Sequence, residues 1–350
     1  ERSRGLGDVY KRQVEDIQAQ VGTNLKIYRG SLDRTSLRLA SLGSRDLTYR
    51  LAWLKENISQ FIGTGIVYCL TIRDVEMVAS WLNACGIQAA HYSGDAEASD
   101  RLALEELLKL NKIKVIAATS ALGMGYDKPD LSFVVHFQMP SSPVAYYQQV
   151  GRAGRAIEEA FGVLMNGPED GAIWEYFLKT SLPVETEAKA LLKAVLEHSQ
   201  VSPDGWVNPR LIHADLNMGP IRIELLMKLL DVEGYLEYQR VETYGKRMVR
   251  LTPKPYVYDA DRIESVAMLR RSEQAQMQEY LDITSCRMAF IRNTLDDQDV
   301  HNCGRCDNCV PMQFNEPSAM SIKEAKEFLE NRVLEIEPRK QMPNGSTIRA

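Results

Sequence analysis

The chain has 350 residues, 45% of them hydrophobic, which suggests two or three domains that each have enough apolar residues for a core. With 42 basic and 47 acidic residues, it is neither a disordered polyelectrolyte nor a protein with a uniformly basic surface, although a net charge of −5 still permits a local patch that binds nucleic acid. No run is apolar enough to cross a bilayer and the first residues lack a signal-peptide pattern, so we expect a cytoplasmic protein without a membrane partner.

The first 45 residues carry little pattern. Residues 1–12 have no hydrophobic period and are expected to be a cloning or assembly remnant. In residues 13–45, VEDIQAQVG suggests a helix and LKIYRG a short strand. This is too little for a domain, so we expect the end of a preceding domain and a linker.

Residues 46–182 alternate amphipathic helices with short apolar strands. Strands that are apolar throughout and separated by helices indicate a parallel sheet covered on both faces, with ligands beyond the carboxyl ends of the strands. We therefore predict an α/β domain of the doubly wound type. The predicted strands are 65–70, 87–92, 114–119, 132–137 and 161–166, and the predicted helices are 46–60, 73–85, 96–110 and 143–150.

The second half of the chain has a different order of elements. In residues 183–258, three short helices precede a β-hairpin formed by YLEYQRVE and MVRLT, which is the order of a winged helix. The helices are expected at 185–199, from Asn208 as N-cap, and at 220–231. In residues 259–313 a long helix at 260–280 leads to a cysteine cluster, and in residues 314–350 a helix at 321–334 precedes a tail that we expect to be truncated.

The strongest local motif is a set of four cysteines, Cys286, Cys303, Cys306 and Cys309. Two-residue gaps let thiolates converge on one tetrahedral ion, and the longer gap lets a helix that begins at Cys286 supply the fourth ligand. We predict a structural zinc site, because four closed ligands leave no open position for catalysis. An iron–sulfur cluster and two pairs of ordinary buried cysteines are the alternatives, and His301 is expected to be a bystander.

Two further motifs follow predicted elements of the α/β domain. In QQVGRAGR (148–155), two glycines break a helix, and Arg152 and Arg155 lie three residues apart, where guanidinium groups bind phosphate oxygens. A glycine-terminated helix with two solvated arginines is the alternative. ATSALGMGYDKPD (118–130) follows a buried strand and carries Gly125 and Asp127 where phosphates or nucleic acid approach.

Together these stretches resemble the second RecA-like lobe of superfamily 2 helicases, specifically the RecQ family. TSALGMGYDKPD corresponds to motif V, QQVGRAGR to motif VI, and GIVYCLTIRDVEMVASWLNACGIQAAHYSGD is similar to the region around motif IV, while TSCRMAFIRNTL and CGRCDNC resemble the RecQ zinc module. The resemblance covers residues 14–312 and implies a RecA-like lobe, a winged helix and a zinc module. It also implies an ATP-dependent 3′ to 5′ DNA helicase of DNA repair and recombination, with ATP and Mg²⁺ as further cofactors.

The resemblance also assigns roles to residues. Arg155 and Arg152 would act as arginine fingers in catalysis together with Gln148 and Gln149, and Gly125, Asp127 and Gly151 would contact nucleotide. The 350 residues contain no G-x-x-x-x-G-K-[ST] motif and no DExH box. We therefore expect the first helicase lobe as a partner in cis, with residues 13–45 as its end, and no ATPase activity from this chain alone.

The order of domains departs from that of most RecQ proteins, in which the winged helix follows the zinc module. It resembles the RqlH-like bacterial subgroup, where a wing domain is inserted between the second lobe and the zinc module and a phosphoribosyltransferase-like domain can follow. The alternative from another class is a non-catalytic zinc and winged-helix DNA-binding regulatory protein. A nucleotide-modifying transferase would need a catalytic constellation that the sequence does not offer.

The expected partner is DNA, as single strands and as branched or tailed duplex, in the bacterial nucleoid. Residues 220–233, which contain the third wing helix, carry two basic and three acidic residues. The hairpin at 239–250 carries four basic residues and one acidic residue, so we expect the hairpin to contact DNA. A solvated basic edge is the alternative. The predicted DNA contacts are His91, Ser93, Thr119, Ser120, Lys128, Arg240, Tyr244, Lys246 and Arg247.

Overall fold

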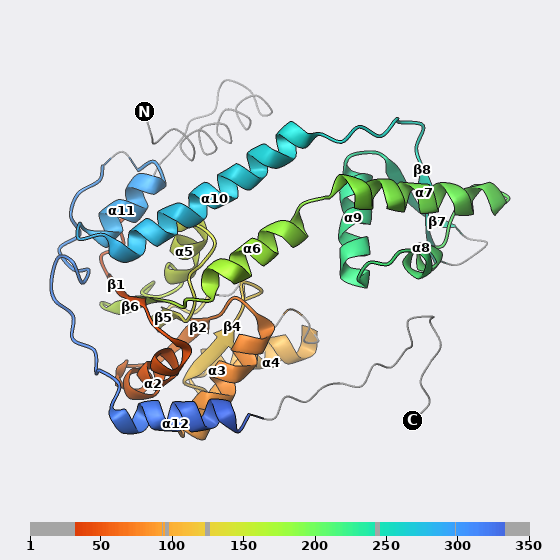
Figure 1. Cartoon of the computed structure of the whole chain (residues 1–350). Helices are drawn as coiled ribbons and strands as arrows, with labels where there is room; N and C mark the ends of the chain where they lie inside the picture. The colour runs from red at the N-terminus through yellow and green to blue at the C-terminus, as the bar shows by residue number, and fades with distance from the viewer. Residues whose placement is uncertain are drawn as a thin grey trace. The chain divides into compact units, whose positions relative to one another are not determined.

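A computed structural model describes residues 32–92, 94, 98–122, 127–241, 246–297 and 299–332 (Figure 1). The chain divides into two compact units, one formed by residues up to 174 together with 269–332, the other by residues 175–268. The predicted remnant, the helix and strand expected before residue 31, and the tail after residue 332 lie outside the described residues. The domain boundaries stay predictions.

The first unit contains a six-stranded parallel sheet. Its strand order is β1-β6-β5-β2-β4-β3, and every neighbouring pair is parallel. The RecA-like α/β prediction is therefore confirmed. The strands are β1 (Leu37–Ser44), β2 (Thr64–Tyr68), β3 (Ala89–Tyr92), β4 (Val115–Ala118), β5 (Leu131–His136) and β6 (Ala160–Asn166).

Helices cover both faces of this sheet, because alternate residues of its strands belong to different cores. Ile66 and Tyr68 pack in one core with α4 (Ala98–Lys109) and α5 (Pro143–Val150), and Val67 packs in the other. The second core contains side chains of α2 (Leu47–Asn57), of α3 (Ile72–Ala84) and of the C-terminal α12 (Ala319–Glu330). A 3-10 turn, η1 (Ile58–Gln60), follows α2. Side-chain caps from Asp46, Thr71 and Ser142 begin α2, α3 and α5.

The cysteine-bearing segment belongs to the same unit. It contains the later part of α10 (Ala260–Asp282) and α11 (Arg287–Thr294), whose side chains Met277, Tyr280 and Met288 extend the first core. The backbone N–H of Asp307 donates to Leu39 O of β1 at 2.9 Å, and the Asp307 carboxylate accepts from the N–H of Ser41 at 2.9 Å. This segment therefore occupies backbone groups on the free edge of β1.

Two elements of the first unit were not predicted. Strand β1 lies in the segment expected to be the end of a preceding domain and a linker, but it pairs with β6 along the edge of the sheet. Helix α6 (Asp170–Ser181) follows β6 and runs across the boundary between the two units. Strand β1 pairs with a strand more than 100 residues away, and α6 hydrogen-bonds the backbone of Met139. A local sequence pattern does not reveal either contact.

The second unit has the predicted order of three helices and a hairpin. Helices α7 (Glu185–Val201), α8 (Pro209–Asp215) and α9 (Pro220–Val232) precede the antiparallel strands β7 (Leu236–Val241) and β8 (Lys246–Leu251). Val207 forms a β-bridge with Val249, which adds a short third segment to the hairpin. This is the arrangement of a winged helix, with a core of its own. No helix in the described part of the chain has the length and hydropathy required to span a bilayer.

A buried carboxylate fixes the connection between β5 and α5. Asp170, at the start of α6, is only 1% exposed, and its Oδ2 accepts from the N–H of Met139 at 2.8 Å. The Trp174 indole donates to Met139 O at 3.1 Å. The backbone N–H and C=O of Met139 are therefore both hydrogen-bonded to side chains of α6. Burial raises the pKa of Asp170 to about 7, because desolvation disfavours the charged carboxylate.

This pKa predicts a pH dependence that is specific to Asp170. The folded state holds the proton up to about pH 7, whereas an unfolded aspartate releases it near its ordinary pKa of 3.8. Between these values the folded state binds more protons, so Asp170 contributes a loss of stability as pH rises, by at most about 1.4 kcal/mol per pH unit. We expect Asp170→Asn to remove this contribution. Urea unfolding of both proteins from pH 4 to 8 measures it, and parallel pH profiles would contradict it.

Candidate functional site

The two glycine-rich motifs lie side by side in the first unit. The N–H of Gly154 donates to Leu131 O at 2.9 Å, and the N–H of Ala156 donates to Pro129 O at 2.9 Å. Thr119 and Ser120 directly follow the carboxyl end of β4, as expected, whereas Leu131 is the first residue of β5. Motif V therefore crosses from the carboxyl end of one strand to the amino end of another. The end of motif VI lies beside the start of β5, which differs from the expected place at the carboxyl ends.

Arg155 is ion-paired with the motif V aspartate. Its Nη1 lies 2.7 Å from Asp127 Oδ1, and the two side chains are 38% and 60% exposed. An ion pair this exposed stabilises a fold by roughly 0.2–1 kcal/mol. The guanidinium group is thus held near motif V by an interaction weak enough to be exchanged for another anion.

Arg152 is held differently, because it is half-buried over the sheet. Its positive charge lies close enough to Tyr68, the last residue of β2, to lower the pKa of the phenol. The Tyr68 hydroxyl donates to Leu122 O in motif V at 3.2 Å. Burial raises the pKa of Tyr68 to about 12 against the opposing effect of Arg152, so the hydroxyl stays protonated at neutral pH.

The two glutamines of motif VI have different surroundings. Gln149 Oε1 lies 2.7 Å from Nε2 of His136, which ends β5 and is 1% exposed, while Gln148 is exposed. Burial lowers the pKa of His136 to about 4, so the imidazole is neutral at physiological pH. Neither Tyr68 nor His136 was predicted. The signal that could have identified them is a polar aromatic ring at the last position of a mostly apolar strand, β2 for Tyr68 and β5 for His136.

Packing explains the glycines of motif VI. Gly154 has a φ of +73°, and a Cβ there would lie 2.5 Å from the Ser36 hydroxyl. A Cβ on Gly151 would lie 2.8 Å from Tyr147 O. Contact of Gly151 with nucleotide stays a prediction, and Gly125 lies outside the described residues.

The residues predicted to contact DNA differ in their exposure to solvent. His91 and Ser120 are exposed, and the Thr119 hydroxyl accepts from the N–H of Ala121 at 3.2 Å. Lys128 is buried, and its ammonium group pairs with Asp130, which holds the pKa of Asp130 below its usual value. As it stands, Lys128 therefore does not face solvent. Ser93 and Tyr244 lie outside the described residues, and of Arg240, Lys246 and Arg247 only the backbone, in β7 and β8, is described.

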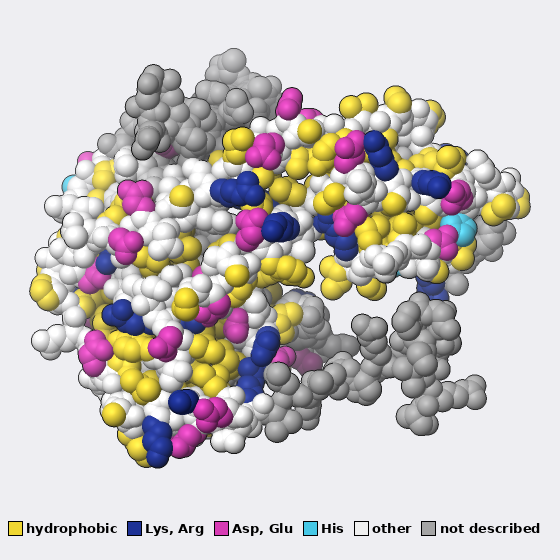
Figure 2. Space-filling view, viewed as in Figure 1, with side chains coloured by type: hydrophobic (Ala, Val, Ile, Leu, Met, Phe, Trp, Pro, Cys, Tyr) yellow, Lys and Arg dark blue, Asp and Glu magenta, His cyan; other side chains and the backbone are white. Residues whose placement is uncertain are grey.

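Charge is not segregated on the face seen in Figure 2. Basic and acidic side chains are interspersed there across the described residues.

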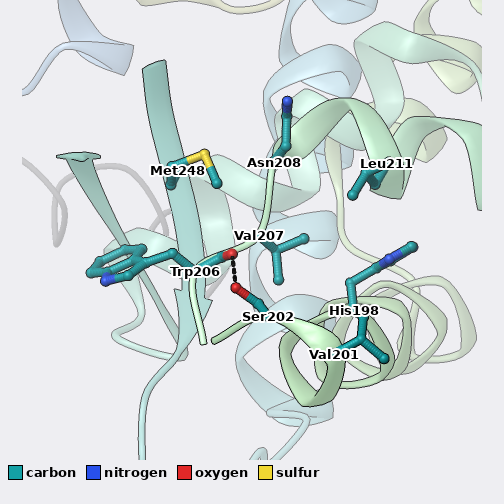
Figure 3. A pocket seen from close by; sticks show the side chains of 8 residues that line it. All are labelled: His198, Val201, Ser202, Trp206, Val207, Asn208, Leu211 and Met248. Carbon is teal, nitrogen blue, oxygen red and sulfur yellow. Dashed lines mark hydrogen bonds between the residues drawn. The ribbon is translucent and has the colours of Figure 1, made fainter. Parts of the chain in front are cut away.

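In the second unit, a hollow of about 360 Å³ lies between the end of α7, the start of α8 and β8. None of the predicted site residues lines this hollow. The residues that line it, shown in Figure 3, are His198, Val201, Ser202, Trp206, Val207, Asn208, Leu211 and Met248.

The four cysteines converge as their spacing predicted. Their sulfur atoms all lie within 4.8 Å of one another, with 3.9 Å from Cys306 to Cys286 and 3.4 Å from Cys306 to Cys309. A tetrahedral zinc ion with Zn–S bonds of about 2.3 Å requires sulfur separations of roughly 3.8 Å. Backbone N–H groups of Arg287, Ala289 and Cys303 point at these sulfurs, which favours thiolates. The donor set and its geometry fit zinc.

The cluster is anchored by a buried arginine. Arg287 donates to Asp307 Oδ1 and to Tyr280 O, the latter at 2.7 Å, and its own N–H contacts the sulfur of Cys306. Because Asp307 also pairs with β1, a single side chain connects the metal-binding loop to the sheet edge. Such an outer shell orients ligands and fixes the loop that carries them.

Comparisons with known proteins agree with both parts of this unit. The model of the helicase conserved C-terminal domain matches residues 49–157, and the RecQ zinc-binding model matches residues 255–310. The chain belongs to the RecQ family. The zinc prediction is confirmed with it, since the four cysteines form the metal site of a RecQ zinc-binding domain.

Individual RecQ relatives match different shares of the chain. An ATP-dependent DNA helicase RecQ from Synechocystis is 27% identical over 264 residues, which are 71% of this chain and 49% of that protein. A RecQ helicase from Pasteurella multocida is 35% identical over 146 residues, 42% of this chain and 23% of that protein. A putative ATP-dependent DNA helicase Q1 from Caenorhabditis briggsae is 40% identical over 147 residues, 41% of this chain and 24% of that protein. The chain thus spans less than half of the length of these three relatives.

Removal of one zinc ligand tests the metal site. We expect Cys306→Ala to lose the zinc that the wild-type chain binds in equimolar amount. The thermal midpoint should fall by roughly 5 °C or more, because the metal stabilises only the folded loop. Atomic absorption and thermal unfolding measure the two effects. Cys85→Ser, outside the cluster, is the matched control, and a full equivalent of zinc in Cys306→Ala would contradict the assignment.

Proposed function

We propose that this chain is the C-terminal part of an ATP-dependent 3′ to 5′ DNA helicase of the RecQ type, which acts in DNA repair and recombination in the bacterial nucleoid. The finer assignment is the RqlH-like subgroup, with the wing domain inserted between the RecA-like lobe and the zinc module. ATP and Mg²⁺ would be bound with a partner lobe in cis that carries the Walker motifs. Single-stranded and branched or tailed duplex DNA is the substrate.

The observation that carries this proposal is the position of the two motif VI arginines. Arg155 pairs with Asp127 of motif V, and Arg152, three residues earlier in the same loop, lies close enough to Tyr68 to lower its pKa. Phosphoryl transfer needs positive charge placed close to the γ-phosphate and little covalent chemistry from the protein. Two guanidinium groups on the loop after α5 supply that charge once a nucleotide lobe presents the phosphate.

The exposed ion pair of Arg155 fits a finger that changes partner. A triphosphate carries more charge than one carboxylate and binds a guanidinium group bidentately, so phosphate competes well for Arg155. Asp127 then becomes free to contact the nucleotide or its magnesium ion. Gln148, exposed at the same helix end, completes the set of motif VI side chains that reach solvent.

Substitution of Arg155 tests the proposal. In the protein that joins this chain to its nucleotide-binding lobe, we expect Arg155→Ala to lower DNA-stimulated ATP hydrolysis about 10³-fold or more, because the transition-state charge loses its partner. ATP-dependent unwinding should fall in parallel. Arg38→Ala is the matched control, since Arg38 forms a comparably exposed ion pair with Glu159. Equal hydrolysis by Arg155→Ala and wild type would refute the finger, and hydrolysis by this chain alone would refute the need for a partner lobe.

The wing hairpin is the proposed DNA contact of the second unit. Arg222, the arginine of the third wing helix, is not available, because it donates to Glu187, to Thr180 O and to Leu182 O. The outer face of α9 therefore offers Lys228 together with Glu224 and the exposed apolar Ile221. This leaves the hairpin strands, where Arg240 and Arg247 are cross-strand neighbours, as the basic element of the wing.

Charge reversal tests the hairpin. We expect the double variant Lys246→Glu, Arg247→Glu to weaken binding of single-stranded DNA and to make the slope of log affinity against log salt shallower by about 1.4, the value for two lost phosphate contacts. Fluorescence anisotropy at several salt concentrations measures both. The control is Lys189→Glu, Lys193→Glu on α7, where both lysines are exposed in i,i+4 pairs. The same salt slope in the hairpin variant and wild type would exclude the contact.

A further inference from the structure

We infer that Ser36 is a positioning residue, which fixes the backbone that carries Arg155 and so places its guanidinium group for phosphoryl transfer. The inference rests on the proposed function, because it assigns Arg155 a role in the reaction. Ser36 directly precedes β1, in the segment expected to be a linker, and belongs to neither motif V nor motif VI. It acts through the backbone of Gly154 and not on the nucleotide.

The Ser36 hydroxyl is bonded to the peptide immediately before Arg155. Its Oγ donates to Gly154 O at 2.6 Å. The backbone of Ser36 is held as well, since its carbonyl accepts from the N–H of Ala160, the first residue of β6, at 2.8 Å. The hydroxyl is therefore presented from the start of the β1–β6 pair, and it connects motif VI to the edge of the parallel sheet.

The residues before Ser36 are held on two sides. Leu32 O accepts from the Tyr147 hydroxyl at 2.6 Å, and Tyr147 lies in α5, the helix that contains the start of motif VI. The Asp33 carboxylate forms an ion pair with Arg305 of the zinc-binding segment. These contacts fix the chain that leads to Ser36, so its hydroxyl keeps one position relative to motif VI.

The close approach of Ser36 to motif VI depends on glycine. Gly154 has a φ of +73°, and an added Cβ would lie 2.5 Å from Ser36 Oγ and 3.0 Å from the Cβ of Ala160. The N–H of Gly154 donates to Leu131 O at 2.9 Å, while its carbonyl accepts from Ser36. Both polar backbone groups of Gly154 are thus paired, one with the start of β5 and the other with the residue before β1.

Arg155 has a fixed backbone and a side chain that is held only weakly. The carbonyl of Gly154 is bonded on one side of it, and the N–H of Ala156 donates to Pro129 O at 2.9 Å on the other. The side chain forms the exposed ion pair with Asp127, which a phosphate can replace. After that exchange the backbone decides where the guanidinium group lies. A small misplacement of a reacting or stabilising group slows the chemical step, so the effect of Ser36 is expected in kcat and not in the binding of ATP.

A double-mutant cycle tests the inference in the protein that carries both helicase lobes. Ser36→Ala removes one oxygen atom and keeps the Cβ. We expect kcat for DNA-stimulated ATP hydrolysis to fall about 5-fold, the effect of losing one neutral hydrogen bond, with KM for ATP unchanged. In an Arg155→Ala background the same substitution should have no further effect, because the group that it positions is gone.

Ser132→Ala is the matched control. Ser132 lies in β5, and its hydroxyl also donates to a backbone carbonyl, that of Thr64, at 3.1 Å. This variant loses a hydrogen bond of the same kind from the same sheet, so we expect a similar loss of thermal stability and the kcat of wild type. Rates are compared at a temperature at which circular dichroism shows every variant to be folded.

Several results would overturn the inference or its basis. An unchanged kcat in Ser36→Ala, or an equal loss in the wild-type and Arg155→Ala backgrounds, would show that the hydroxyl only supports packing. The same fall in kcat in Ser132→Ala would assign the effect to the stability of the sheet. A change in KM alone would place Ser36 in nucleotide binding and not in positioning. Full activity of Arg155→Ala would instead remove the finger and with it the proposed function, so the two failures are distinguishable.

Discussion

The exposed edge of the parallel sheet is the constraint on which the first unit depends. Strand β1 has β6 on one side and, on the other, backbone groups that need partners. Asp307 provides them with its own N–H and its carboxylate. Because Asp307 lies between two zinc ligands, Cys306 and Cys309, folding of the metal loop and completion of the sheet edge are one event.

This coupling explains how the chain tolerates a domain inserted into the unit. The winged helix lies between two parts of the first unit in sequence, and α6 and α10 both cross the boundary. The segment that follows the inserted domain must pack against the sheet although the two are far apart in sequence. The side chains of Tyr280 and Met288 in the first core and the pairing of Asp307 with β1 provide that return. Residue 307 and strand β1 are far apart in sequence, and the metal helps by ordering the short segment that presents Asp307 to the strand.

Much of this was predictable from sequence, for physical reasons. Strands such as β5 are apolar throughout because both of their faces are buried, and helix caps such as Ser142 followed by Pro143 mark their positions. Cysteine spacing fixed the metal ligands, since short gaps between thiolates permit few geometries. Strand β1 was missed because LRLASLGS mixes polar and apolar residues and is stabilised by β6, which is more than 100 residues away.

The site was less predictable than the fold. Motifs V and VI named the correct loops, but the partners of their side chains follow from tertiary structure. Arg155 pairs with Asp127 only because motif V crosses the sheet to reach the start of β5. Lys128 is the opposite case, where a basic residue that suggested a phosphate contact is buried against Asp130. A charge count does not distinguish these outcomes.

Under the proposed function, the two arginines therefore contribute in different ways. An exposed ion pair is worth little, so exchanging Asp127 for phosphate costs Arg155 little and lets it respond to the nucleotide. Arg152 is half-buried, and its charge acts where electrostatic interactions are less screened than in water, as its effect on the pKa of Tyr68 indicates. Arg155 therefore changes partner when a phosphate is bound, whereas the charge of Arg152 stays in a half-buried position where it is less screened.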